Sequence, residues 1–222
     1  MIIIYISGID GCGKTTQATQ LVKQLSDKNV SVEYQWLRWE PSVVNALKLL
    51  KKLMGKNTKS SKKAVESNER AESKWDDLKQ RLMKSTIFRK IWLRYAANDY
   101  FRSYNNAIKK WDSDVIIMDR YVFDFFVDQS INFDLTIDEM KNIFEKTKIS
   151  KLHQPDFNII IDIPAETGFQ RKMDGTSLTY LEQREYKYRE MEGDNVLHLD
   201  GTREISEIQI EIQNWINDRA EL

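Results

Sequence analysis

The chain contains a single cysteine, Cys12, so it can form no internal disulfide. Neither sign of charge is in excess, because 34 Lys and Arg residues balance 34 Asp and Glu residues. No apolar run approaches the length of a membrane-spanning helix. We therefore expect neither nucleic acid nor a membrane as a partner. Met1 leads directly into an apolar strand with no signal peptide, from which we expect a cytoplasmic protein.

The composition is that of an ordinary globular protein: 41% of the 222 residues are hydrophobic and 31% are charged. This composition and length favour a single domain that spans residues 1–222. Short apolar stretches alternate with longer helical patterns along the chain. Strands are predicted at residues 2–6, 30–39, 115–118, 157–163 and 196–199, and helices at 15–28, 91–111 and 205–216. Uninterrupted apolar strands are typical of sheets that helices cover on both faces. The pattern predicts a doubly wound, three-layer α/β/α fold with a mainly parallel five-stranded sheet.

One region fits this alternation least well. Residues 42–90 are predicted to be a helical and loop insertion, with a polar, basic stretch at 55–63 that has little to bury. Two interpretations stay open for that stretch: a flap over a bound acceptor, or a solvated surface loop.

Residues 8–15 read Gly-Ile-Asp-Gly-Cys-Gly-Lys-Thr, a complete G-x-x-x-x-G-K-[ST] phosphate-binding loop. The motif leaves a predicted strand and enters a predicted helix, as such a loop must. Its backbone N–H groups and the positive end of the helix favour phosphate oxygens. We therefore predict that Lys14 reaches the β- and γ-phosphates of a nucleoside triphosphate and that the Thr15 hydroxyl ligates magnesium. The residues predicted to contact this nucleotide are Gly8, Asp10, Gly11, Cys12, Gly13, Lys14, Thr15 and Thr16.

A second chemical signal follows the strand at 115–118, which ends in Asp119 and Arg120. A carboxylate at the tip of a strand beside a phosphate loop can hold magnesium. The planar guanidinium of Arg120 suits a phosphate oxygen of an acceptor. Ligands of open α/β sheets bind at the carboxyl ends of the strands, so the sequence predicts that both motifs meet there.

With these motifs in place, the chain resembles the thymidylate kinase family of phosphate-loop nucleoside monophosphate kinases. Residues 8–17, Gly-Ile-Asp-Gly-Cys-Gly-Lys-Thr-Thr-Gln, carry the family's Asp inside the loop and its Thr-Thr-Gln after the loop lysine. Asp119-Arg-Tyr121 matches the family's Asp-Arg-Tyr motif. Arg38-Trp-Glu-Pro41 is similar to its Arg-Glu-Pro element with one residue inserted, and Gln129 stands where the family has a glutamine.

The resemblance implies transfer of the ATP γ-phosphate to a nucleoside monophosphate, and thymidine monophosphate (dTMP) is the first acceptor to expect. It also implies Mg²⁺ as the metal. Lys14, Arg120 and Arg171 are the residues expected to act in catalysis. Arg171 is also expected to contact ATP from a short lid at about residues 168–185. A homodimer is expected by analogy alone. Asp119 is expected to be a metal ligand as well. The residues expected to bind or surround the acceptor are Asp10, Arg38, Glu40, Pro41, Asp119, Arg120, Asp124, Asp128 and Gln129.

The chain departs from the family pattern at two carboxylates, Asp124 and Asp128, which stand where the family has a serine and a tyrosine. Carboxylates there would repel a phosphate and are suited to sugar hydroxyls or to a basic group. In the lid region, Lys172 and Arg184 are equally compatible with nucleotide contact and with ordinary solvated helix charges.

Three functions therefore stay open. The first is a kinase of thymidylate kinase type, the second is a phosphate-loop kinase of another small molecule, and the third is a nucleotide-binding protein without transfer activity. No Asn-Lys-x-Asp guanine-reading motif is present, which argues against a GTPase switch.

Overall fold

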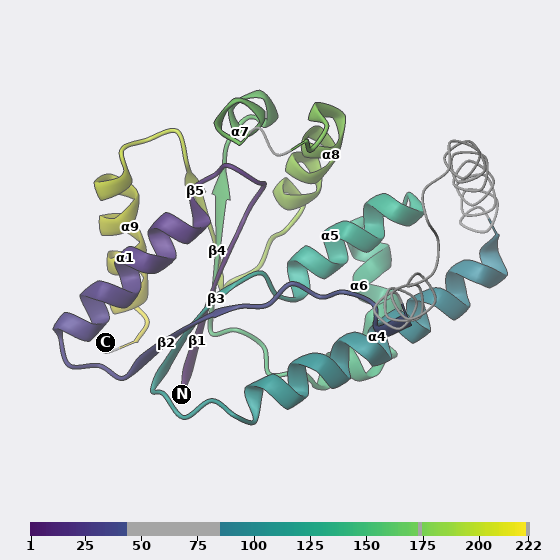
Figure 1. The fold of residues 1–222 in the computed structure, drawn as a ribbon, viewed down its shortest axis with the longest axis horizontal. Coiled ribbons are helices and arrows are strands. Elements are labelled where there is room, and N and C mark those ends of the chain that lie inside the picture. Colours follow the sequence, from purple (N-terminus) through teal and green to yellow (C-terminus); the bar gives the residue numbers. More distant parts are fainter. Residues whose placement is uncertain (44–84, 173–174, 221–222) are drawn as a thin grey trace, which may run out of the picture.

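The computed structural model describes residues 1–43, 85–172 and 175–220 (Figure 1). The predicted insertion at about 42–90 lies, from residue 44 to residue 84, outside the described residues. The same holds for residues 173 and 174 in the predicted lid. No helix of the described ranges has both the length and the apolar character that crossing a bilayer would require.

A five-stranded parallel sheet forms the centre of the molecule, with the strand order β2-β3-β1-β4-β5. The strands are β1 (Ile2–Ser7), β2 (Val32–Trp36), β3 (Val115–Asp119), β4 (Phe157–Asp162) and β5 (Val196–Asp200). β1 and β3 are almost entirely buried, which is why they read as uninterrupted apolar runs. The order reverses direction on either side of β1, so the doubly wound α/β prediction is confirmed.

The strand predicted at 30–39 is shorter in the structure, where β2 ends at Trp36. β2 is an edge strand that pairs with β3 alone, and its partner β3 ends at Asp119, opposite Trp36. One further backbone bond, from Leu37 N to Asp119 O (3.2 Å), continues the pairing. Beyond it the chain leaves the sheet, so Arg38 belongs to a loop at the carboxyl edge.

Helices cover both faces of the sheet. Figure 1 shows α1 (Lys14–Asp27) and α9 (Ile205–Asn217) on one side of it, and α4 (Thr86–Ile108), α5 (Val122–Phe133) and α6 (Ile137–Glu145) on the other. The 3₁₀ helix η2 (Lys148–Lys151) follows α6. Two helices, α7 (Ala165–Arg171) and α8 (Leu178–Arg189), lie beyond the carboxyl end of β4.

The helix predicted at 91–111 begins five residues earlier and ends at Ile108. Its first turn is capped by Ser85, whose hydroxyl accepts a hydrogen bond from Phe88 N at 3.4 Å. Such a cap satisfies an N–H group that has no partner inside the helix, which stabilises the earlier start. α4 thus extends along the edge of the molecule and carries Asp99 and Tyr100 toward the end of β2.

Candidate active site

The phosphate loop joins β1 to α1 and depends on glycine conformations. Gly8, Gly11 and Gly13 have φ angles of 136°, 84° and 97°, which L side chains rarely adopt. A Cβ on Gly8 would also lie 2.4 Å from the carbonyl oxygen of Ile161. Lys14 begins α1 and is buried, and its ammonium donates to the carbonyls of Gly8 (3.0 Å) and Ile9 (2.8 Å). The loop therefore places one cation at its centre and the start of a helix beside it.

Asp119, at the end of β3, lies directly against the phosphate loop. Its Oδ2 accepts hydrogen bonds from the Thr15 hydroxyl (2.9 Å) and from the Tyr34 hydroxyl (3.1 Å). Its Oδ1 is buried and has no hydrogen-bond partner among the described residues. Burial, together with the charge of Asp119, raises the pKa of Tyr34 to about 12, so Tyr34 donates as a neutral phenol. The structure thus brings together Thr15 and Asp119, the two predicted metal ligands.

Arg120 links the end of β3 to the phosphate loop. Its Nη2 lies 2.6 Å from Asp10 Oδ1, and the Lys172 ammonium lies 3.5 Å from the same oxygen. Burial alone would raise the pKa of Asp10, but the charges of Arg120, Lys14 and Lys172 outweigh it and lower that pKa. Asp10 is therefore an ionised group surrounded by cations.

Asp124 is placed differently from the sequence-based expectation. The sequence led us to expect a carboxylate facing the acceptor, whereas the structure buries Asp124 and occupies both of its oxygens. Oδ1 accepts from the Tyr188 hydroxyl (2.6 Å) and contacts Arg184 Nη2 (3.3 Å), and Oδ2 accepts from the Tyr5 hydroxyl and from Tyr121 N (3.1 Å). Burial would raise the pKa of Asp124, but two neighbouring arginines lower it. Asp124 is thus an ionised partner of arginines inside the protein.

Arg184 is the charged residue whose surroundings were least predictable from the sequence. From the sequence, Arg184 was equally compatible with nucleotide contact and with an ordinary solvated helix charge, but its side chain is only 3% exposed. Its Nη1 pairs with Asp128 and lies 3.1 Å from the Tyr180 hydroxyl. We call Arg120, Asp124, Asp128 and Arg184 the buried ion cluster, although the Asp128 side chain itself is 41% exposed.

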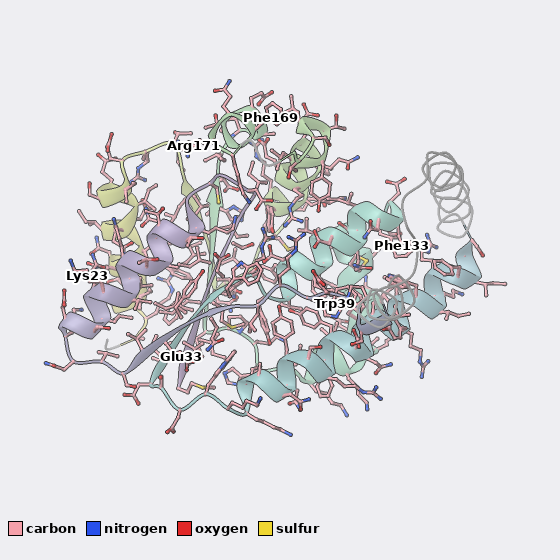
Figure 2. All side chains as sticks on the ribbon, viewed as in Figure 1. Lys23, Glu33, Trp39, Phe133, Phe169 and Arg171 are labelled. Carbon is pink, nitrogen blue, oxygen red and sulfur yellow. The ribbon has the colours of Figure 1, made fainter. Side chains whose placement is uncertain are left out.

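A cavity next to this cluster lies between the loop after β2, α4 and α5. Its lining includes Arg38, Trp39, Tyr100, Arg120 and Asp128. Figure 2 shows Trp39 between α4 and α5. The Trp39 ring meets the Phe125 ring edge-on, with centroids 5.0 Å apart.

The remaining predicted acceptor residues are more scattered. Glu40 and Arg38 line an adjacent cavity of about 360 Å³, and Pro41 is half-buried next to them. Gln129 does not line either cavity, because its Oε1 accepts a hydrogen bond from Trp92 Nε1 of α4 (3.0 Å). The loop 37–42 is anchored to α4 by Asp99, whose Oδ2 accepts from Trp39 Nε1 at 3.1 Å.

Arg171 lies at the other side of the phosphate loop, at the end of α7 (Figure 2). Its Nη1 is 3.4 Å from the Gly11 carbonyl and 3.3 Å from the Gly201 carbonyl, which are long contacts of an exposed side chain. The predicted lid at about 168–185 therefore lies against the phosphate loop at Gly168, Arg171 and Lys172, and residues 178–185 belong to α8.

Three side chains at the candidate site were not among the site residues expected from the sequence. Tyr34 and Tyr5 had no signal, because single tyrosines on strands are ordinary core residues. Arg184 had one: Tyr180, Arg184 and Tyr188 are spaced by four residues, so they share one face of a helix. A cation flanked by two tyrosines on one face indicates a buried ion pair rather than a solvated charge.

The fold and the site together define a phosphate-loop kinase. A phosphate loop leaves the central strand of a parallel sheet, and a strand-end Asp-Arg pair contacts that loop from the neighbouring strand. A family model described as thymidylate kinase matches residues 6–212, and the chain belongs to the thymidylate kinase family. It is thus an ATP-dependent nucleoside monophosphate kinase, with phosphotransferase activity of thymidylate kinase type.

A curated relative agrees with this assignment. Over 169 residues the chain is 28% identical to a protein described as thymidylate kinase from Mycoplasmopsis agalactiae. The matched region covers 76% of this chain and 67% of that protein.

Proposed function

We propose that the protein transfers the γ-phosphate of ATP to dTMP and so forms the diphosphate. The observation that carries this proposal is the 2.6 Å contact between Arg120 and Asp10 of the phosphate loop. A donor phosphate held by the loop and an acceptor phosphate held by Arg120 would meet within one site. Phosphoryl transfer passes through a loose transition state, so alignment and charge neutralisation account for most of the catalysis.

We assign the donor side to the phosphate loop, with Mg²⁺ as the metal. Thr15 and Asp119 would hold the ion, because Asp119 Oδ1 is a buried oxygen without a hydrogen-bond partner in the described ranges. No group of three or more His, Cys, Asp or Glu side chains suited to a metal occurs in those ranges. Two protein oxygens are nevertheless enough for Mg²⁺, which usually keeps several waters and also binds substrate phosphates. Bound magnesium would neutralise charge on the transferred phosphoryl group.

Three cations complete the proposed site. Lys14 neutralises the β- and γ-phosphates, Arg120 binds the acceptor phosphate, and Arg171 approaches ATP from the lid side of the loop. The residues proposed to surround the acceptor, besides Arg120, are Asp10, Arg38, Glu40, Pro41, Asp119, Asp124, Asp128 and Gln129. For Asp124 and Gln129 this role is indirect, since the Asp124 oxygens already accept from protein donors and Gln129 lines neither cavity.

A second acceptor class is favoured by one observation. The half-exposed Asp128 carboxylate lines the same small cavity, of about 20 Å³, as Arg38 and Arg120, and its Oδ1 already pairs with Arg184. Its other oxygen would accept a hydrogen bond from an acceptor that carries a donor near its phosphate. The cytoplasmic location and the homodimer stay predictions.

The proposal is tested by ADP formation from ATP and Mg²⁺ with a panel of nucleoside monophosphates, with thymidine, and without acceptor. Rapid ADP release with dTMP, and its loss in Lys14→Ala, is the expected result. If ADP is released only with a different monophosphate, that monophosphate replaces dTMP as the proposed acceptor. Silence across the panel from a protein that still binds ATP would contradict the proposed reaction.

A further inference from the structure

Two carboxylates hold the Arg120 guanidinium, one at each terminal nitrogen. Its Nη2 contacts Asp10 Oδ1 at 2.6 Å, and its Nη1 contacts Asp124 Oδ1 at 3.4 Å. The backbone of Arg120 has a φ of 75°, a conformation that residues other than glycine seldom adopt. The direction of this side chain is therefore determined by its backbone and by the positions of Asp10 and Asp124.

Asp124 is held in turn by α8. The oxygen that contacts Arg120 also accepts from the Tyr188 hydroxyl (2.6 Å) and lies 3.3 Å from Arg184 Nη2. Arg184 Nη2 donates to the Tyr188 hydroxyl as well (2.8 Å), so the two α8 side chains support each other. The Arg184 and Asp124 side chains are only 3% and 7% exposed. A buried charge that loses its partner is strongly unfavourable, so a shift of α8 would displace Asp124 with it.

The other carboxylate is tied to α7. Asp10 Oδ1 lies 3.5 Å from the ammonium of Lys172, the residue that caps the C-terminal end of α7. α7 and α8 pack against each other beyond the carboxyl end of β4 (Figure 1). Asp10 and Asp124, the two carboxylates that orient the Arg120 guanidinium, are thus each paired with a cation from this pair of helices or its end. The chain of alternating charges runs through Lys172, Asp10, Arg120, Asp124 and Arg184.

We propose that Arg184 is a positioning residue for the acceptor: through Asp124 it fixes the direction of the Arg120 guanidinium. The position of α8 then sets the affinity for the acceptor phosphate. The inference rests on the proposed role of Arg120 in binding that phosphate. Disturbing Arg184 raises the KM for the acceptor and leaves the KM for ATP unchanged, because no contact joins Arg184 to Lys14 or Thr15 in the described part of the chain.

The test is a double-mutant cycle between Arg184 and Arg120, measured by steady-state kinetics with the best acceptor of the panel. Arg184→Lys keeps the charge but loses the fork that reaches Asp124 and Asp128 together. We expect it to raise the acceptor KM about tenfold, as for coupled neighbours, with the ATP KM within about twofold of wild type. In an Arg120→Lys background the same change should have less than about a twofold effect. Equal rises in both KM values, or the full effect in that background, would overturn the inference.

Two further variants keep the test valid if Arg184→Lys folds poorly. Tyr188→Phe removes one hydroxyl that contacts both Asp124 and Arg184, and it leaves every charge paired. It should raise the acceptor KM by about two- to fivefold, and an unchanged acceptor KM would count against the proposal. Arg189→Lys is the matched control on the same helix, because Arg189 is exposed and pairs with Glu185. It should match wild type in both KM values.

The kinetics also separate this inference from the proposed function. If Arg120→Lys leaves the acceptor KM of the active enzyme unchanged, the acceptor role of Arg120 fails and the inference fails with it. If Arg120→Lys raises the acceptor KM while Arg184→Lys and Tyr188→Phe do not, the acceptor role holds and the positioning role of Arg184 is refuted.

Discussion

Adding one methyl group at Gly168 is expected to weaken ATP binding, because α7 and the phosphate loop touch through two glycines. A Cβ on Gly168 would lie 2.6 Å from the carbonyl oxygen of Asp10, and a Cβ on Gly11 would lie 2.6 Å from the carbonyl oxygen of Gly168. Gly168 lies inside a helix and has no positive φ, so alanine suits its backbone and favours the helix. Any loss in Gly168→Ala therefore comes from the close approach itself.

The size of the effect follows from the contact distance. An ordinary contact begins near 3.4 Å, so α7 and the loop would have to separate by 3.4 − 2.6 = 0.8 Å. The nearest atom, the Asp10 carbonyl oxygen, belongs to the backbone, which cannot turn aside as a flexible side chain does; the next, Ile9 Cδ1 at 3.0 Å, is the end of a side chain. Overpacking of this kind costs about 1–3 kcal/mol. A displacement near 1 Å in a phosphoryl-transfer site can lower the rate by about a hundredfold.

The assay measures ATP affinity by calorimetry and kcat/KM by ADP release. Gly168→Ala should weaken ATP binding by about tenfold or more and lower kcat/KM by about ten- to a hundredfold. Gly193→Ala is the matched control, since its Cβ would meet its nearest atom, Val196 Cγ2, at an ordinary 3.4 Å. Wild-type affinity and rate in Gly168→Ala would refute the idea that the α7 contact shapes the loop.

Three further outcomes are expected. Lys14→Ala should lower kcat a hundredfold or more, about 3–4 kcal/mol of transition-state stabilisation, and keep a cooperative thermal unfolding transition; a normal rate would contradict the site. Asp119→Asn should raise the magnesium concentration for half-maximal rate by about tenfold or more in a magnesium titration, and an unchanged titration would exclude Asp119 as a ligand. The hydrogen bond to Asp162 raises the pKa of His198 above 6.5, so this contact stabilises the fold fully below pH 6.5 and loses that effect as the pH rises through the raised pKa. Urea unfolding should show a larger loss in His198→Gln at pH 6 than at pH 9, and equal losses at both would contradict the assignment.

The strands of the sheet could be predicted because of where they lie. β1 and β3 are buried on both faces, and burial on both faces requires the continuous apolar runs that the sequence displays. α5 was not predicted from the sequence; most of its residues are buried, the polar Asp124, Gln129 and Ser130 among them, so burial does not follow residue type along it. α6 carried a readable start signal, the capping box of Thr136 and Glu139, although sequence analysis did not use it.

The ends of the helices and of β2 were less predictable for a local reason. Helix ends depend on single capping contacts such as the one from Ser85, and these are weak compared with the burial of a whole apolar face. The end of β2 depended on its partner, because an edge strand can continue only as far as β3 pairs with it.

The sequence by itself determined the phosphate loop and the Asp-Arg pair, since each is a run of neighbouring residues whose glycines, lysine and carboxylate act where the chain places them. Only the tertiary structure decided the partners of Asp124 and Arg184. Residues 60 positions apart meet there, from two helices that pack against each other. The sequence of a helix does not reveal whether a charged residue faces water or another helix. Burial against the other helix, rather than residue type, makes such a charge part of a site.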